Sequence, residues 1–337
     1  KGILLRKLLA AASAALLALS LSSCSSINSE QAMFDTLKPA CGDVSTQPAS
    51  GREVDRVTVG GTDAAPSVDF AAPLSAKDVQ TKILSEGTGP KITGNQTVSL
   101  EYLGVNAGTG EVFQPTSFDG SGASVQVLTP GQQPGFCEAL GSVREGSRVA
   151  ILFPASVIHQ NQGIEQLKLG KNDDVLFIMQ IHKVYLPYAV GNEKPAQTGF
   201  PTIVRAVNGI PGVKIPTESP FPKASKDGQE ATATEVLIEG AGDAVVEGDS
   251  VLLHYAGYTW ADGAKFDSSW DKGTPATFTI AKGQLIQGFV DAVVGQKVGS
   301  QIVAVIPPNL GYGAQAQGTI PANSTLVFVI DILGIQK

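Results

Sequence analysis

The stretch that decides the fold lies near the C-terminal end of the chain. It contains four blocks, VLLHYAGYTW (251–260), GAKFDSSW (263–270), TFTIAKGQLIQGFVDAVVGQKVGS (277–300) and IPPNLGYGAQAQGTIPANSTLVFVIDIL (306–333). The third block holds apolar residues at helical spacing, and the first and last hold apolar runs that are typical of strands. Both kinds of secondary structure are therefore expected within one short stretch of chain.

The helix is predicted from apolar residues that recur on one face of a 3.6-residue repeat. They are Leu285, Ile286, Phe289, Val290, Val293 and Val294, and Gly295 follows where a C-terminal cap is expected. Strands are predicted at 251–258, 301–306 and 326–333, the last apolar on both faces and therefore central. One helix with several distant strands predicts an α+β domain, in which an antiparallel sheet carries a single helix on one face.

The chain also repeats itself. Tyr102, Phe113 and Phe136 each precede their matches, Tyr255, Phe266 and Phe289, by 153 positions (255 − 102). Further on, LFIMQI (176–181) overlays VFVIDI (327–332), and upstream Pro66-x-Val68-x-Phe70 is similar to Pro211-x-Val213-x-Ile215. A repeat of this length indicates two domains. We expect them at 62–188 and 209–337, joined by a linker at 189–208.

The four blocks together resemble the FKBP-type peptidyl-prolyl cis/trans isomerases, in their order and their spacing. The resemblance implies two FKBP-like domains, each an antiparallel sheet wrapped on one short helix, and an enzyme that needs no cofactor and no metal. It implies catalytic roles for Asp267, for the hydroxyl of Tyr312 and for the backbone N–H of Ile286. The implied walls of the substrate cup are Tyr255, Phe266, Leu285, Phe289, Ile320 and Phe328.

Such a cup suits the isomerisation of X–Pro bonds, which rotate against a barrier of about 18–20 kcal/mol. The twisted transition state is less polar than the planar amide, so apolar walls favour it by withholding hydration. Donors at Tyr312 and Ile286 are expected to bind substrate carbonyls, and Asp267 to orient the cup. A structural interpretation stands beside this one. Taken singly, the aromatic residues suit a core, and Asp267 suits a turn or a helix cap.

The first copy keeps the aromatic positions of the cup but not its reactive lining. Tyr102, Phe113, Phe136 and Phe177 hold the aromatic positions. Gln114 replaces Asp267, Gln132 and Gln133 replace Leu285 and Ile286, and His159 replaces Tyr312. A cup with these amides excludes water poorly. We therefore expect the first domain, 62–188, to be a folded but weakened or inactive copy.

The N-terminal segment has the pattern of an export signal. Lys1, Arg6 and Lys7 precede an apolar run that is too short to span a membrane, and the run ends in Leu21-Ser22-Ser23-Cys24, which resembles a bacterial lipobox. We expect a signal peptide at 1–23, lipidation of Cys24 and a flexible tether at 24–61, which would anchor the protein at the extracytoplasmic face of the cell membrane. The alternative is an ordinary secretory signal with a coincidental cysteine.

Charge, cysteines and histidines narrow the remaining possibilities. The net charge is −7 without a basic cluster, which argues against nucleic acid as a partner. Outside the cytoplasm Cys41 and Cys137 have two interpretations, a disulfide that pins the tether to the first domain, or a buried small apolar residue at Cys137. The three histidines, His159, His182 and His254, lack the spacing of a metal site.

Three functions remain open from the sequence. The first is an isomerase for proline-containing exported polypeptides, with FK506-type macrolides as candidate ligands. The second is a non-catalytic, membrane-tethered chaperone or peptide-binding scaffold. The third is a structural spacer in the cell envelope. The intact lining from Asp267 to Phe328 favours the enzyme.

Overall fold

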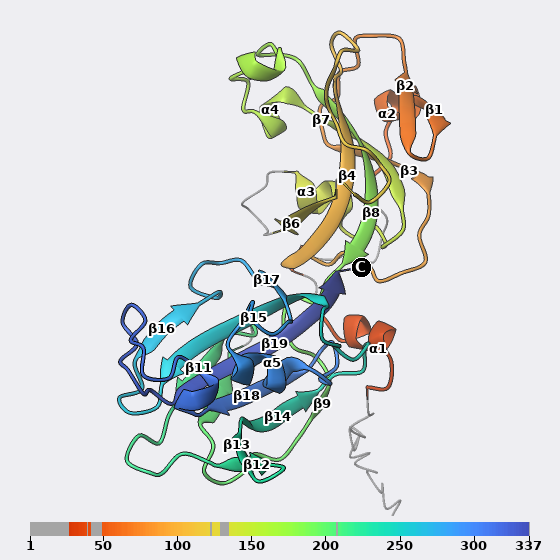
Figure 1. The fold of residues 1–337 in the computed structure, drawn as a ribbon. Helices are drawn as coiled ribbons and strands as arrows, with labels where there is room; N and C mark the ends of the chain where they lie inside the picture. Colours follow the sequence, from red (N-terminus) through yellow and green to blue (C-terminus); the bar gives the residue numbers. More distant parts are fainter. Residues whose placement is uncertain are drawn as a thin grey trace, which may run out of the picture.

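The protein was analysed as a computed structural model, which describes residues 27–38, 40–41, 49–121, 123–128, 135–206 and 208–336. In this part of the chain two antiparallel sheets dominate, one in each repeat, and each carries a short helix (Figure 1). The α+β class and the division into two similar domains are therefore confirmed. The expected signal peptide, 1–23, and Cys24 lie outside the described residues.

The second domain is built on a seven-stranded sheet in the order β16-β15-β19-β18-β14-β9, with β17 paired to β15. Its elements are β9 (Asn192–Glu193), β12 (Ala224–Lys226), β13 (Gln229–Ala231), β14 (Ala233–Glu239), β15 (Ser250–Thr259), β16 (Lys265–Ser268), β17 (Ala276–Thr279), α5 (Gln287–Val293), β18 (Gln301–Ile306), η2 (Pro308–Leu310) and β19 (Leu326–Gln336). The apolar strands β18 and β19 are buried and central, as predicted. Helix α5 ends at Val293, and Gly295, just after the cap residue Val294, has a φ of 85°, in the left-handed region that favours glycine.

The first domain repeats this plan with a six-stranded sheet in the order β3-β7-β8-β4-β5, with β6 paired to β4. Its elements are α2 (Arg52–Asp55), β3 (Gln80–Ser85), β4 (Gln96–Asn106), β5 (Val112–Pro115), β6 (Ser124–Leu128), α3 (Phe136–Leu140), β7 (Arg148–Phe153), α4 (Ala155–Ile158), η1 (Glu165–Leu167) and β8 (Val175–Val184). Even a detail of hydrogen bonding recurs. Thr116 Oγ1 accepts the N–H of Tyr102, and Ser269 Oγ accepts the N–H of Tyr255, both at 2.8 Å.

The stretch 189–208, which we expected to be a linker, is instead built into the second domain. Strand β9 pairs with β14, and β10 (Thr202–Arg205) forms a hairpin with β11 (Pro211–Lys214). The first domain has the matching hairpin of β1 (Thr58–Thr62) and β2 (Ala65–Asp69). Apolar side chains of each hairpin pack on the face of the sheet that is turned away from the helix, which is the physical reason that neither segment is free.

The described part of the expected tether is likewise packed rather than flexible. Helix α1 (Glu30–Asp35) buries Met33 completely, and Met33 Sδ accepts the N–H of Ala241 at 3.4 Å. Beyond α1, Cys41 forms a disulfide with Cys137 on α3. Of the two interpretations of Cys41 and Cys137, the structure therefore supports the disulfide. The N-terminal strap, residues 27–41, is attached to both domains, because its helix contacts the second and its cysteine is bonded to the first.

A buried carboxylate on β19 holds the start of the 189–208 stretch against the sheet of the second domain. Asp331 Oδ2 accepts the N–H of Ala189 at 2.8 Å, and Oδ1 accepts Gln301 Nε2 at 2.7 Å. Arg205 Nη1 donates to the carbonyl of Ala189 at 2.6 Å. Burial raises the pKa of Asp331 to about 6. In the described residues no helix is long and apolar enough to cross a membrane.

Candidate active site

A cavity of about 500 Å³ opens between the sheet and the helix of the second domain. It is lined by Tyr255 from β15, Phe266 and Asp267 from β16, Phe278 from β17, Phe289 from α5, Phe328 from β19, and Gly283, Gln284, Leu285, Ile286 and Tyr312 from loops. We call this cavity the second cup. The strand pleat directs alternate side chains to one face, so the paired strands bring these distant residues together.

The aromatic floor of the second cup is a connected cluster centred on Phe328. The rings of Phe289 and Phe266 meet Phe328 edge to face, with centroids 5.3 and 5.6 Å away. Phe278 packs against Phe289 at 6.0 Å and against Tyr255 at 5.5 Å. Such pairs contribute about 0.5–1.5 kcal/mol each beyond burial of area. The floor is therefore rigid and apolar.

Asp267 is the charged group at the rim of this floor. Its Oδ2 accepts the hydroxyl of Tyr255, and its Oδ1 accepts Lys272 Nζ at 2.6 Å and the N–H of Ser268 at 2.8 Å. Burial by itself would raise the pKa of Asp267, but the hydrogen bonds from Lys272 and Tyr255 outweigh it and lower the pKa. At neutral pH the cup therefore holds a fixed carboxylate whose orientation is set by Tyr255.

The other two predicted catalytic groups, Ile286 and Tyr312, come from the start of α5 and from the loop after η2. Ile286 caps α5, and its carbonyl accepts the N–H of Phe289 at 3.0 Å. Tyr312 lies in a loop that is held by two backbone hydrogen bonds of its neighbour Gly313. The N–H of Gly313 donates to the carbonyl of Pro308, and the carbonyl of Gly313 accepts the N–H of Asn323. The structure thus brings Asp267, Ile286 and Tyr312 to one cavity, while their roles remain predictions.

Two lining assignments differ from the sequence prediction. Ile320 is buried, with 6% exposure, and packs in the core beside the cup rather than lining it. Phe278 lines the cup but was missed, although its signal was present in the alternation Thr277-Phe278-Thr279. That alternation predicts a strand with one inward side chain. Only the pairing of β17 with β15 shows that the ring enters the cup.

Known proteins match this part of the chain. The family model for FKBP-type peptidyl-prolyl cis-trans isomerases matches residues 242–333. FK506-binding protein 1A of Neurospora crassa is 43% identical over 104 residues, which are 30% of this chain and 86% of that protein. The chain belongs to the FKBP-type peptidyl-prolyl cis-trans isomerase family. FK506-binding protein 2 of Gibberella zeae is 44% identical over 89 residues, which are 26% of this chain and less than half, 46%, of that protein.

One solved structure resembles a larger part of this FKBP-type chain. It contains the three FKBP domains of wheat FKBP73 and covers 77% of this chain and 95% of that one, with 18% sequence identity and a TM-score of 0.33. Within the residues that the structure describes, no group of three His, Cys, Asp or Glu side chains comes together as a metal site.

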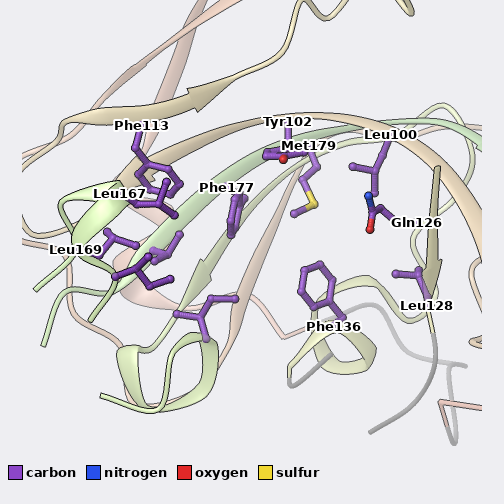
Figure 2. A pocket seen from close by; sticks show the side chains of 13 residues that line it. Leu100, Tyr102, Phe113, Gln126, Leu128, Phe136, Leu167, Leu169, Phe177 and Met179 are labelled. Atoms are coloured by element: carbon purple, nitrogen blue, oxygen red, sulfur yellow. The ribbon is translucent and has the colours of Figure 1, made fainter. Parts of the chain in front are cut away.

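The first FKBP-like domain has a cavity of its own, of about 300 Å³. We call it the first cup, and Figure 2 shows its side chains converging from the sheet, from α3 and from the loop after β7. Its lining is Leu100, Tyr102, Phe113, Gln126, Leu128, Phe136, Ile158, Ile164, Leu167, Leu169, Val175, Phe177 and Met179. The described lining is therefore largely apolar.

The amides of the first cup differ from those predicted. Gln132 and Gln133 lie outside the described residues, and of Gln114 the structure gives only the backbone, in β5. Among the described residues, the amide that lines the cup is Gln126. Gln126 pairs with Val98 on β4, and Phe278 pairs with the matching residue, Val251, on β15. An amide thus stands where the second cup has an aromatic ring.

His159, which matches Tyr312 in sequence, does not line the first cup. Its Nδ1 accepts the N–H of Gly163 at 3.2 Å, so Nε2 carries the proton and donates to the carbonyl of Asp173 at 2.9 Å. The ring is 8% exposed. Both nitrogens are therefore used inside the loop, and His159 offers no donor to a ligand in the cup.

Proposed function

We propose that the second cup catalyses cis/trans isomerisation of X–Pro bonds. The observation that carries this assignment is the Tyr255–Asp267 hydrogen bond at the rim of an aromatic cavity that also contains Tyr312. An apolar floor accommodates the proline ring and withholds water from the amide, which disfavours its planar, polar form. The hydroxyl of Tyr312 and the N–H of Ile286 then bind the flanking carbonyls, and Asp267 holds Tyr255 in place.

Export and anchoring belong to the same proposal. The substrates are proline-containing exported polypeptides, and the protein is anchored by lipid at Cys24 on the extracytoplasmic face of the cell membrane. The Leu21-Ser22-Ser23-Cys24 motif supports this location. The Cys41–Cys137 disulfide supports it independently, since such bonds persist mainly outside the cytoplasm. FK506-type macrolides are proposed as ligands because two relatives are named for binding FK506.

A second candidate function, a membrane-tethered scaffold that binds peptides without turnover, is favoured by the first cup. This cavity has apolar walls, yet glutamine stands at the position of Asp267 and His159 is occupied by its own loop. We therefore propose that isomerase activity belongs to the second domain, with the first domain weak or inactive.

Removing the same hydroxyl from each cup tests the assignment. Tyr255→Phe should lower the rate of X–Pro isomerisation by roughly tenfold, if about 1.4 kcal/mol of its hydrogen bond to Asp267 acts in the transition state. The matched variant Tyr102→Phe should keep the full rate. A protease-coupled assay with a proline peptide measures both. Equal losses, or none in Tyr255→Phe, would overturn the assignment.

The location is tested at Cys24. Cys24→Ser should block acylation and release the protein from membranes, whereas mass spectrometry of the wild-type N-terminal peptide should find acyl chains on Cys24. An unmodified N-terminus downstream of Cys24 would instead mean a freely secreted isomerase.

A further inference from the structure

The first cup leaves large apolar side chains in contact with solvent. Seven of its lining residues are only partly buried, namely Tyr102, Phe113, Phe136, Ile158, Ile164, Leu167 and Phe177. Covering apolar surface of this kind contributes about 25 cal/mol per Å². No charged side chain is among the described lining residues. An apolar group that enters the cavity is therefore stabilised without desolvating an ion.

The wall of the first cup is held in place before any ligand arrives. Four apolar side chains come from the segment between β7 and β8: Ile158 ends α4, Leu167 ends η1, and Ile164 and Leu169 flank η1. Figure 2 labels Leu167 and Leu169. His159 ties this loop to Asp173, and Asp174 Oδ1 accepts the N–H of Ala155 at 2.8 Å at its start. An isolated bridge joins Ile164 and Leu169. Because the wall is ordered by these bonds, a ligand does not have to order it, which favours binding.

The size of the first cup and the one amide among its described lining residues indicate the ligand. A volume of about 300 Å³ is at the lower end of ligand sites, which fits an amino-acid side chain better than a large molecule. Gln126, which is exposed at the edge of the apolar walls, adds an acceptor oxygen and an NH2 group, of which one N–H donates to Ser124 Oγ at 3.3 Å and the other is left for a ligand. An apolar side chain attached to a peptide backbone satisfies both features, since its backbone N–H and C=O can pair with the amide.

We propose that the first cup binds a bulky apolar side chain, such as leucine or phenylalanine, displayed by an unfolded polypeptide, and that it holds the chain without isomerising it. Proline is not required, because the matches of Asp267 and Tyr312 supply no charged or hydroxyl group to the cup. The proposal deepens the proposed function by adding a holding site on the same chain. A polypeptide held there has a raised effective concentration at the second cup.

The test uses the full chain and a fluorescein-labelled, proline-free peptide of Gly, Ser and Asn around a central Leu-Phe-Leu. Fluorescence anisotropy should show binding of this peptide and none of its Ser-Ser-Ser counterpart. Leu167→Ser and Ile164→Ser, at the partly exposed wall, should each weaken binding at least tenfold. A leucine-to-serine change in the second cup, Leu285→Ser, should leave it unchanged. Melting curves confirm that each variant is folded.

A second measurement does not depend on variants. The same peptide with benzoylphenylalanine in place of Phe should crosslink on irradiation to tryptic fragments of the first cup, between residues 100 and 179, rather than to those of the second. Leu167→Ser should keep the wild-type isomerase rate, so loss of peptide binding and loss of catalysis are separate results. Wild-type affinity in both folded wall variants, equal binding of the serine peptide, or crosslinks confined to the second cup would overturn the proposal.

Discussion

Phe328 connects the core of the second domain to its cup, so removing its ring tests both. The side chain is 5% exposed and meets Phe289, Phe266 and Tyr255 with ring centroids between 5.3 and 6.4 Å. Truncating a buried phenylalanine costs about 3–5 kcal/mol, because transfer free energy is lost and a cavity remains. That is a large part of the roughly 5–15 kcal/mol that stabilises a typical domain.

We expect Phe328→Ala to lower the free energy of unfolding by about 3–5 kcal/mol in urea titrations. The rate of X–Pro isomerisation should fall at least tenfold, because the floor of the cup loses the ring on which three other aromatic residues pack. The rate must be measured at low temperature on protein whose circular dichroism matches the wild type. Phe177→Ala, the matched change in the first cup, should reduce stability but preserve the rate. A folded Phe328→Ala variant with wild-type activity would refute the assignment of the second cup.

Three more predictions concern Tyr312 in the second cup, the buried carboxylate of Asp331 and the N-terminal strap. Tyr312→Phe should lower the isomerase rate only a few-fold in the protease-coupled assay, because it removes one hydrogen bond of about 0.5–1.5 kcal/mol and leaves the ring in place; a loss as large as that of Phe328→Ala would argue against this role. Burial raises the pKa of Asp331 to about 6 in the folded state. Between about pH 4 and 6 the folded protein therefore holds a proton on Asp331 that the unfolded chain has lost. The stability that comes from this proton is lost as the pH rises through 6. Asp331→Asn should remove this pH-dependent part of the free energy of unfolding, which urea titrations at pH 4.5 and 7.5 measure. An unchanged pH dependence in the variant would contradict the prediction. Reducing the Cys41–Cys137 disulfide, which closes a separation of 96 residues, should destabilise the first domain by about 2–5 kcal/mol, and an unchanged thermal midpoint under reductant would show that the strap holds without it.

Much of the fold was predictable because the pattern is local or repeated. The stripe from Leu285 to Val294 predicted α5, and the apolar runs predicted β15, β18 and β19 to within a few residues at their ends. The alignment of the two copies predicted which aromatic residues share a cup. The positions of Phe278 and Ile320 were not predictable in this way. Whether a side chain enters a cavity or the core beside it depends on strand register and on neighbours far along the chain.

The sequence by itself determined the family, the α+β class, the two-domain repeat and most residues of the second cup, because local periodicity and spacing carry that information. Only the tertiary structure decided the rest. The structure shows that Met33 contacts Ala241, that Cys41 and Cys137 form a disulfide, and that the expected linker contains the strands β9 and β10. It also shows that the described lining of the first cup is largely apolar, with part of its wall supplied by residues 158–169. The contact of Met33 with Ala241, the disulfide and the pairing of β9 with β14 each join residues distant in sequence, and the free energy that selects them comes from burial and pairing that no local pattern records.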